Sequence, residues 1–249
     1  MKTITSAQNG QIKLLRSLKD KKGRSANGLF VAEGGNLVKD MQDKSGALFV
    51  RASDTDRHGH ILSLWKGEIN LVADGVFDSV TDTVQSQGIL ALVSFPVPSP
   101  LSQRIVLVMD GISDPGNAGT IIRTACAMGI TDIAAADSAD CYNPKAVRAS
   151  MGGIFQANLI TGSRLEILDL LKGYTVAVLD MGGKDVYHYK PPPNLALVVG
   201  NEAHGISAEF RERADAVLAV PMACERIESL NAAVSASIAL SVITHNANA

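Results

Sequence analysis

The sequence has few cysteines and no long apolar run, and both absences limit what the protein can be. Its cysteines, Cys126, Cys141 and Cys224, follow no paired spacing, so we expect reduced thiols rather than a disulfide framework or a zinc site. No apolar stretch approaches the roughly 18 residues that a membrane-spanning helix needs. The polar segment Met1–Gly10 lacks the hydrophobic core of a signal peptide. These features predict a cytoplasmic protein with no metal and no membrane partner.

Aromatic residues are also scarce, at 4%, whereas hydrophobic residues make up 46% of the 249 positions. This balance is typical of an α/β protein with substantial cores. Three prolines fall within five residues in the segment Phe95–Pro100, where they prevent regular structure and indicate a semi-rigid linker. We therefore expect two domains, residues 1–98 and residues 101–249.

The order of the apolar runs predicts mixed helices and strands on both sides of this linker. The first half suggests a helix at Ile12–Lys22, a strand at Leu29–Ala32, a helix opening at Gly35–Asn36 and a last strand-like run at Ile89–Ser94. In the second half, apolar runs alternate with helical candidates, as in a buried parallel sheet with helices on both faces. These runs are Ile105–Met109, Ile133–Ala136, Val176–Leu179, Leu195–Val199 and Val217–Val220.

Charge is distributed unevenly along the chain. The formal net charge is −2, but residues 1–24 hold seven basic residues against one acidic residue, a net of +6 that leaves −8 for residues 25–249. A basic amino-terminal helix can bind nucleic-acid phosphates, and the residues we expect to do so are Lys13, Arg16, Lys19 and Lys22. The alternative is a helix face that is merely solvated.

Three segments of the second half place glycine or proline turns beside short polar side chains at the ends of apolar runs. They are Asp114–Arg123, Gly200–Gly205 and Pro221–Asn231. Such turns at strand ends are where α/β folds build ligand sites. The first segment lacks the full Gly-x-Gly-x-x-Gly pattern, which argues against a nicotinamide site.

Together these segments resemble the SpoU (TrmH-like) family of the SPOUT superfamily, which comprises RNA ribose 2′-O-methyltransferases. The resemblance lies in an Asn-x-Gly turn leading to Arg123, in the Gly-Asn-Glu-x-x-Gly that ends Leu195–Gly205, and in the Pro-Met and Ser-Leu-Asn of Val220–Asn231. Phe30–Gly34 and Gln87–Ala91 also resemble the amino-terminal substrate-binding domain of many such enzymes. The resemblance implies a carboxyl-terminal parallel-sheet SPOUT domain with a deep trefoil knot, preceded by a small α/β substrate-binding domain.

The same resemblance implies an enzyme that uses S-adenosylmethionine to methylate RNA, and a homodimer with its site near the subunit interface. Ribosomal RNA is favoured over transfer RNA because this kind of amino-terminal domain accompanies many ribosomal-RNA members. Antibiotic-resistance enzymes share the layout, so that role stays open. By resemblance, the catalytic residues are Asn117, Arg123, Glu202, Ser229 and Asn231, and the donor is held around Gly200, Val220, Met222, Leu230 and Asn231.

Residue chemistry refines some of these roles. A guanidinium is a poor general base, so we assign Arg123 to binding a phosphate and stabilising the developing alkoxide. We expect His204 to be non-catalytic and a bulky side chain at Gly200 to block the donor. Asn117 and Ser229 also have plain structural interpretations as helix N-caps. Glu225 is a charged departure from the usual family pattern.

Rival interpretations remain open at this level. One is a methyltransferase that acts on RNA bases with a related knotted fold, and it should show different strand-end motifs. Another is a non-enzymatic RNA-binding relative, which should have lost Arg123 or the glycines of the donor pocket; this chain retains them. A transfer-RNA 2′-O-methyltransferase is the third.

Overall fold

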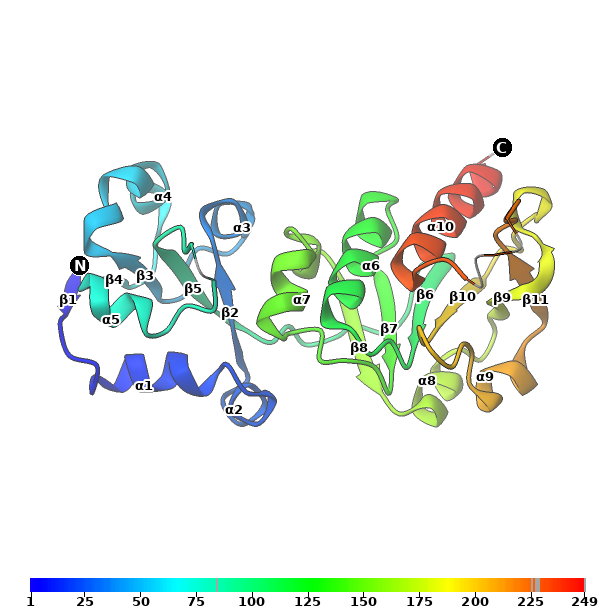
Figure 1. Cartoon of the computed structure of the whole chain (residues 1–249), viewed down its shortest axis with the longest axis horizontal. Coiled ribbons are helices and arrows are strands. Elements are labelled where there is room, and N and C mark those ends of the chain that lie inside the picture. Colours follow the sequence, from blue (N-terminus) through cyan, green and yellow to red (C-terminus); the bar gives the residue numbers. More distant parts are fainter. Residues whose placement is uncertain (84, 225, 227–228, 249) are drawn as a thin grey trace. The chain divides into compact units, whose positions relative to one another are not determined.

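The computed structural model describes residues 1–83, 85–224, 226 and 229–248, which form two compact units (Figure 1). The first unit comprises Met1–Pro96 and Tyr142–Phe155, and the second comprises Val97–Cys141 and Gln156–Ala249. Within the described residues, no helix is both long and apolar enough to cross a membrane. The functional division at residues 98 and 101 stays a prediction.

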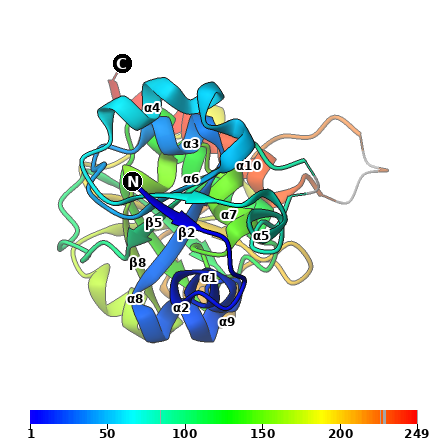
Figure 2. The ribbon, with the colours of Figure 1, turned by 90° about the vertical axis from the view of Figure 1, so that its left-hand side faces the viewer.

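The first unit is built on a mixed sheet of five strands in the order β1-β4-β3-β5-β2. The pairs β1–β4 and β3–β4 are parallel, whereas β5 runs antiparallel to both β3 and β2. Apolar side chains of α1 and α5 pack on one face against Phe49, Val72 and Leu90. Figure 2 shows α1 and α3 on opposite sides of the sheet.

The elements of the first unit begin and end as follows: β1 Lys2–Ile4, α1 Gly10–Ser17, α2 Lys21–Asn27, β2 Leu29–Glu33, α3 Gly35–Asp40, β3 Leu48–Arg51, η1 Ala52–Asp54, η2 Asp56–His58, α4 Gly59–Leu64, β4 Ile69–Val72, α5 Asp74–Asp78, β5 Ile89–Ser94, α7 Pro144–Ala149 and η3 Gly153–Phe155.

The prediction of a single basic helix over Ile12–Lys22 is wrong. The chain forms two short helices, α1 and α2, separated by a turn. Arg24 is buried and donates hydrogen bonds from Nη1 to the carbonyls of Leu18 and Lys19, at 2.7 and 2.6 Å. A Cβ atom on Gly23 would lie only 1.8 Å from the Ser17 carbonyl oxygen. The tight turn thus uses a basic side chain as an internal cap, which the charge pattern alone did not indicate.

An aromatic cluster holds the segment Tyr142–Phe155 within the first unit. The Tyr142 ring lies 4.9 Å from the ring of Phe30 on β2 and 4.4 Å from that of Phe95, measured between centroids. Phe155 lies 6.4 Å from Phe30. Both ends of the segment are therefore fixed by stacking against β2 and the chain that follows β5.

The second unit is built on a sheet of six strands in the order β11-β9-β10-β6-β7-β8. Every pairing in it is parallel, which confirms the expected parallel sheet. The five predicted runs correspond to β6, β7, β9, β10 and β11. The sixth strand, β8, was missed because it lies at the sheet edge, where only Leu159 of its five residues is buried, and its sequence therefore forms no apolar run. The implied trefoil knot stays a prediction.

The elements of the second unit begin and end as follows: β6 Ile105–Asp110, α6 Pro115–Ala127, β7 Asp132–Ala136, β8 Asn158–Gly162, α8 Arg164–Leu170, β9 Thr175–Asp185, η4 Val186–His188, β10 Leu195–Gly200, α9 Ala208–Arg213, β11 Ala216–Ala219 and α10 Ala232–Asn248.

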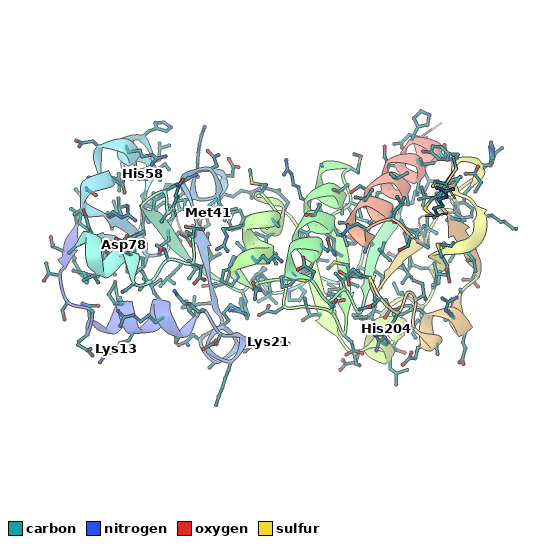
Figure 3. All side chains as sticks on the ribbon, in the orientation of Figure 1. Lys13, Lys21, Met41, His58, Asp78 and His204 are labelled. Atoms are coloured by element: carbon teal, nitrogen blue, oxygen red, sulfur yellow. The ribbon has the colours of Figure 1, made fainter. Side chains whose placement is uncertain are left out.

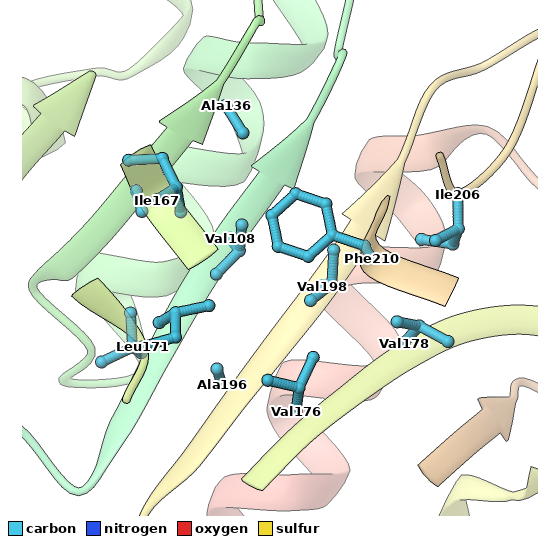
Figure 4. Packing of buried hydrophobic residues seen from close by; sticks show 12 residues of the cluster. Val108, Ala136, Ile167, Leu171, Val176, Val178, Ala196, Val198, Ile206 and Phe210 are labelled. Atoms are coloured by element: carbon cyan, nitrogen blue, oxygen red, sulfur yellow. The ribbon is translucent and has the colours of Figure 1, made fainter. Parts of the chain in front are cut away.

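Helices cover both faces of the parallel sheet. On one face, Ile167 of α8 and Phe210 of α9 pack on strand residues such as Val108 and Val198 (Figure 4). The helices α6 and α10 lie on the other side of the sheet (Figure 1) and contact each other. Because the strands are parallel, their carboxyl ends meet along one edge, where the loops that carry the three sequence motifs begin.

Candidate functional site

A cavity of about 430 Å³ lies at the carboxyl ends of β9, β10 and β11. Four of the five residues predicted to hold the donor line it, namely Gly200, Val220, Met222 and Leu230. Asn231 is adjacent to the lining residues Leu230 and Ala232 and directs its side chain elsewhere, as described below. The second and third sequence motifs therefore do meet in space.

Glu202 connects the second motif to the first. Its Oε2 accepts hydrogen bonds from the backbone N–H and the hydroxyl of Ser113, at 3.1 and 2.9 Å. Its Oε1 accepts from the Asn117 amide at 2.8 Å and, more weakly, from the Asp114 N–H at 3.4 Å. A carboxylate has about four lone-pair sites, so Glu202 is saturated by the loop after β6 and the first turn of α6.

Asn117 extends this network to the third motif. Its side-chain oxygen accepts a hydrogen bond from the Asn231 amide at 3.1 Å, while its side-chain nitrogen donates to Glu202. Three of the five predicted catalytic residues, one from each motif, therefore form a continuous hydrogen-bonded series, Glu202–Asn117–Asn231, which we call the polar chain.

The ionisation of Glu202 follows from these contacts. Burial alone would raise the pKa of the carboxyl group, but the hydrogen bonds from Asn117 and Ser113 act in the opposite direction. The net result is a pKa lowered from the ordinary glutamate value. Glu202 is accordingly an ionised acceptor at neutral pH.

The helix caps differ from those predicted. Asp114, not Asn117, caps α6, because its side chain accepts from the Asn117 N–H and Pro115 occupies the first turn. At α10 the capping side chain is that of Asn231, which accepts from the N–H groups of Ala233 and Val234. Ser229 lines the cavity instead. Because Asp114 caps α6, the Asn117 side chain is left to bind Glu202 and Asn231. Capping of α10 orients Asn231 itself, whose amide nitrogen donates to Asn117.

The loop after β10 is closed on itself. Asn201 and Gly205 exchange backbone hydrogen bonds of 2.9 Å, and the Asn201 side chain accepts from the N–H groups of Ala203 and His204. A Cβ atom on Gly200 would lie 2.6 Å from the Gly205 carbonyl oxygen. A larger residue at Gly200 would therefore collide with its own loop before it met a donor, so the expected reason for this glycine is incomplete.

Arg123 stands apart from the polar chain. It is exposed on α6, and it makes no hydrogen bond or ion pair with any residue that the structure describes. The His204 side chain is also exposed (Figure 3), and only its backbone takes part in the loop. Glu225 lies outside the described residues.

The four predicted RNA-binding residues fall into two pairs. Arg16 donates to the Ser79 hydroxyl at 2.7 Å, and Lys19 pairs with Asp82 at 2.9 Å, so both are engaged within the first unit. Lys13 and Lys22 are exposed, as is the neighbouring Lys21 (Figure 3). Only the exposed pair is available to a phosphate without breaking an internal contact.

Sequence reasoning missed Ser113 and Asp180. Ser113 donates twice to Glu202, yet a lone serine before a recognised motif gives no signal. Asp180 lines the cavity and pairs with Arg211 at 2.5 Å. Its signal was available, because it directly follows the predicted strand Val176–Leu179 at the edge where the site lies.

Comparison with known proteins covers both halves of the chain. A model of the SpoU rRNA Methylase family matches residues 104–241, and a model of the MRM3-like substrate binding domain matches residues 9–91. A 23S rRNA (guanosine(2553)-2′-O)-methyltransferase of Bacillus subtilis is 33% identical over 243 residues, which cover 96% of this chain and 97% of the relative.

Two further similarities extend along most of the chain. The 23S rRNA (guanosine-2′-O-)-methyltransferase RlmB of Neisseria meningitidis is 32% identical and covers 86% of this chain and 84% of its own length. The crystal structure of an AdoMet-bound rRNA methyltransferase from Sinorhizobium meliloti superposes with a TM-score of 0.85 at 27% identity, covering 98% of this chain and 97% of that one.

The lowered pKa of Glu202 predicts a pH-dependent contribution to stability. A carboxylate whose pKa is lowered by folding stabilises the native state fully above its unfolded pKa and loses that effect as the pH falls through the folded value. Replacing Glu202 with Gln should cost about 1 kcal/mol near pH 7, and the difference from wild type should shrink towards pH 3.

Denaturant unfolding at several pH values measures this difference. The exposed Glu212 on α9 provides the control, because Glu212→Gln should show no comparable change. A Glu202→Gln penalty that stays constant between pH 7 and pH 3 would contradict the assignment.

Proposed function

The chain belongs to the SpoU rRNA methylase family, and we propose that it methylates a guanosine ribose of 23S ribosomal RNA. The enzyme is an S-adenosylmethionine-dependent RNA ribose 2′-O-methyltransferase. The observation that carries the proposal is the juxtaposition of the cavity with the polar chain Glu202, Asn117 and Asn231. Guanosine is favoured because two relatives that extend along most of the chain carry that nucleoside in their names.

The cavity fits S-adenosylmethionine. Its volume of about 430 Å³ lies within the range of roughly 300–1,000 Å³ that small-molecule sites occupy. Gly200, Gly205 and Ala219 line it and leave backbone groups accessible to a flat adenine or a ribose. We assign Gly200, Val220, Met222 and Leu230 to donor binding. When bound, S-adenosylmethionine supplies an activated methyl group on a positively charged sulfur.

Glu202 acts as an organiser and not as a general base. All of its acceptor positions are occupied by Ser113, Asp114 and Asn117, so it has no free lone pair to take the proton of a ribose hydroxyl. Its role is to hold the loop after β10 against the start of α6. Asn117 and Asn231 transmit that order to the start of α10, beside which Ser229 lines the cavity.

Arg123 supplies the positive charge. An exposed guanidinium that pairs with no described residue is available to an RNA phosphate, and it stabilises the alkoxide that develops on the 2′-oxygen. The methyl group would pass from the donor sulfur to the 2′-oxygen, the hydroxyl proton would pass to solvent water, and the donor would leave as a neutral thioether.

The active form that we propose is a homodimer. Met222 and Val234, at the cavity and at the start of α10, leave 36% and 46% of their surfaces exposed. A second copy would cover these apolar side chains and complete the surroundings of the site. The proposed place of action is the cytoplasm, where the ribosomal RNA of the bacterial relatives is found.

The substrate can be identified by mapping 2′-O-methylated nucleotides in RNA from cells with and without the gene. We expect one 2′-O-methylguanosine of 23S rRNA to disappear, and the purified protein to restore it. Loss of a methyl group from transfer RNA would select that alternative substrate, loss of a base methyl group would select the related knotted class, and no loss at all would favour a non-enzymatic relative.

Replacing Arg123 with Ala should lower single-turnover methyl transfer by a factor on the order of 10²–10³, as for loss of one oxyanion donor. Donor affinity, measured by calorimetry, should change little because Arg123 does not line the cavity. Arg123→Lys keeps the positive charge but loses the planar guanidinium. Partial activity would indicate that the charge alone acts, and near-complete loss would indicate that bidentate hydrogen bonding is needed. A wild-type rate in Arg123→Ala would refute the assignment.

Charge reversal at Lys13 and Lys22 should weaken RNA binding and reduce the slope of log affinity against log salt, by roughly 0.7–0.9 for each phosphate that is no longer neutralised. The matched variants Arg16→Met and Lys19→Met remove an internal hydrogen bond and an ion pair. They should lower thermal stability and leave the salt slope of RNA binding nearly unchanged. An unchanged slope after reversal of Lys13 and Lys22 would leave these residues as a solvated face.

A further inference from the structure

Asp110 is a buried carboxylate at the carboxyl end of β6. Its side chain is 0% exposed, and both of its oxygens accept a hydrogen bond. Oδ1 accepts from Nε of Arg164 at 2.7 Å, and Oδ2 accepts from the Ser207 N–H at 2.7 Å. A buried charge is retained only where it is paired and hydrogen-bonded. One of the two partners here is Ser207, the residue at which the loop after β10 ends.

The next residue holds the other end of the same loop. The Gly111 carbonyl accepts a hydrogen bond of 2.6 Å from the Asn201 side-chain amide. Gly111 has a positive φ of 68°, and a Cβ atom on it would lie 2.9 Å from an Arg164 guanidinium nitrogen. Asp110 and Gly111 thus fix both ends of residues 201–207, and we call this pair of hydrogen bonds the clamp.

Glu202 lies inside this clamped loop. The loop contributes Asn201, Glu202 and Ala203 to the cavity wall, and Glu202 reaches back to Ser113, only three residues beyond Asp110. If the far end of the loop were released, the position of Glu202 relative to α6 would rest on its own hydrogen bonds alone.

We propose that Asp110 is a positioning residue of the methyltransferase, which acts by fixing residues 201–207 so that Glu202 and the cavity wall keep their places. The proposal rests on the proposed function only for its catalytic consequence, because the clamp itself can be measured without donor or RNA. It assigns to Arg164 the task of neutralising Asp110 in its buried position.

Asp137 provides a matched control. It lies 3.3 Å from the same guanidinium but is 47% exposed and makes no contact with the loop among the described residues. Its positive φ of 44° suits Asn as well as Asp. Asp110→Asn and Asp137→Asn each remove one carboxylate charge beside the same arginine. Only Asp110→Asn also replaces one of the two acceptor oxygens that bind Arg164 and the Ser207 N–H, and the remaining oxygen is expected to stay with the cationic Arg164.

Hydrogen exchange of the free protein tests the clamp directly. Amides of residues 201–207 should exchange at least about tenfold faster in Asp110→Asn than in Asp137→Asn or wild type, with the rest of the second unit unchanged. A uniform increase across the unit, or no increase, would overturn the proposal.

The catalytic consequence is tested by a double-mutant cycle with Glu202→Gln. Asp110→Asn alone should lower single-turnover methylation of a 23S rRNA transcript on the order of 10–100-fold, but less than about threefold in the Glu202→Gln background, because the two changes act on one element. Multiplicative losses would overturn the proposal, whereas a wild-type protein that methylates no RNA would instead refute the proposed function.

A second variant covers the case in which Asp110→Asn fails to fold. Ser207 has a φ of −65°, which proline adopts without strain, so Ser207→Pro removes the N–H donor and leaves the buried Asp110–Arg164 pair in place. It should reproduce the faster exchange and the same coupling to Glu202→Gln. Wild-type exchange and activity in Ser207→Pro would overturn the proposal.

Discussion

The site depends on one carboxylate whose hydrogen-bonding capacity is used up. Glu202 lies at the end of a parallel strand, where it is partly removed from water, and its oxygens accept from Ser113, Asp114 and Asn117. Because ionised acceptors make the stronger hydrogen bonds, this arrangement favours the charged form over the burial that opposes it. The loop after β10 and the start of α6 are thereby held as one body, and the cavity wall takes its shape from them.

The parallel sheet explains why the three motifs can cooperate at all. Each motif follows a different strand or precedes a different helix, and parallel strands deliver all their carboxyl ends to one edge. The helices α6 and α10 begin at that edge, so their capping residues also lie in the site. Asp114 and Asn231 therefore serve local structure and site geometry together, and selection for either role preserves the other.

The sequence indicated which segments meet at the cavity, but it did not predict the hydrogen bonds among their residues. The turns at strand ends indicated the segments that contain Gly200, Glu202 and Asn231, and the resemblance to the SpoU family selected these individual residues. The sequence could not distinguish Asp114 from Asn117 as the cap of α6, since both are good N-caps and lie within one turn. It also missed Arg24 as an internal cap and β8 as an edge strand. These outcomes are decided by tertiary contacts, which local pattern does not contain.

The distribution of charge suits a reaction whose donor is already activated. Methyl transfer from a sulfonium requires alignment and relief of the charge on the accepting oxygen, and it makes little demand on a strong base. A free carboxylate beside the hydroxyl would oppose the developing alkoxide, whereas the oxygens of Glu202 accept hydrogen bonds from Ser113 and Asn117 and hold these residues in place. The exposed Arg123 is the opposite case, a charge left without a described partner. In the proposed mechanism, Glu202 stays ionised but is engaged by hydrogen bonds from Ser113 and Asn117, and the positive charge that acts on the accepting oxygen is that of Arg123.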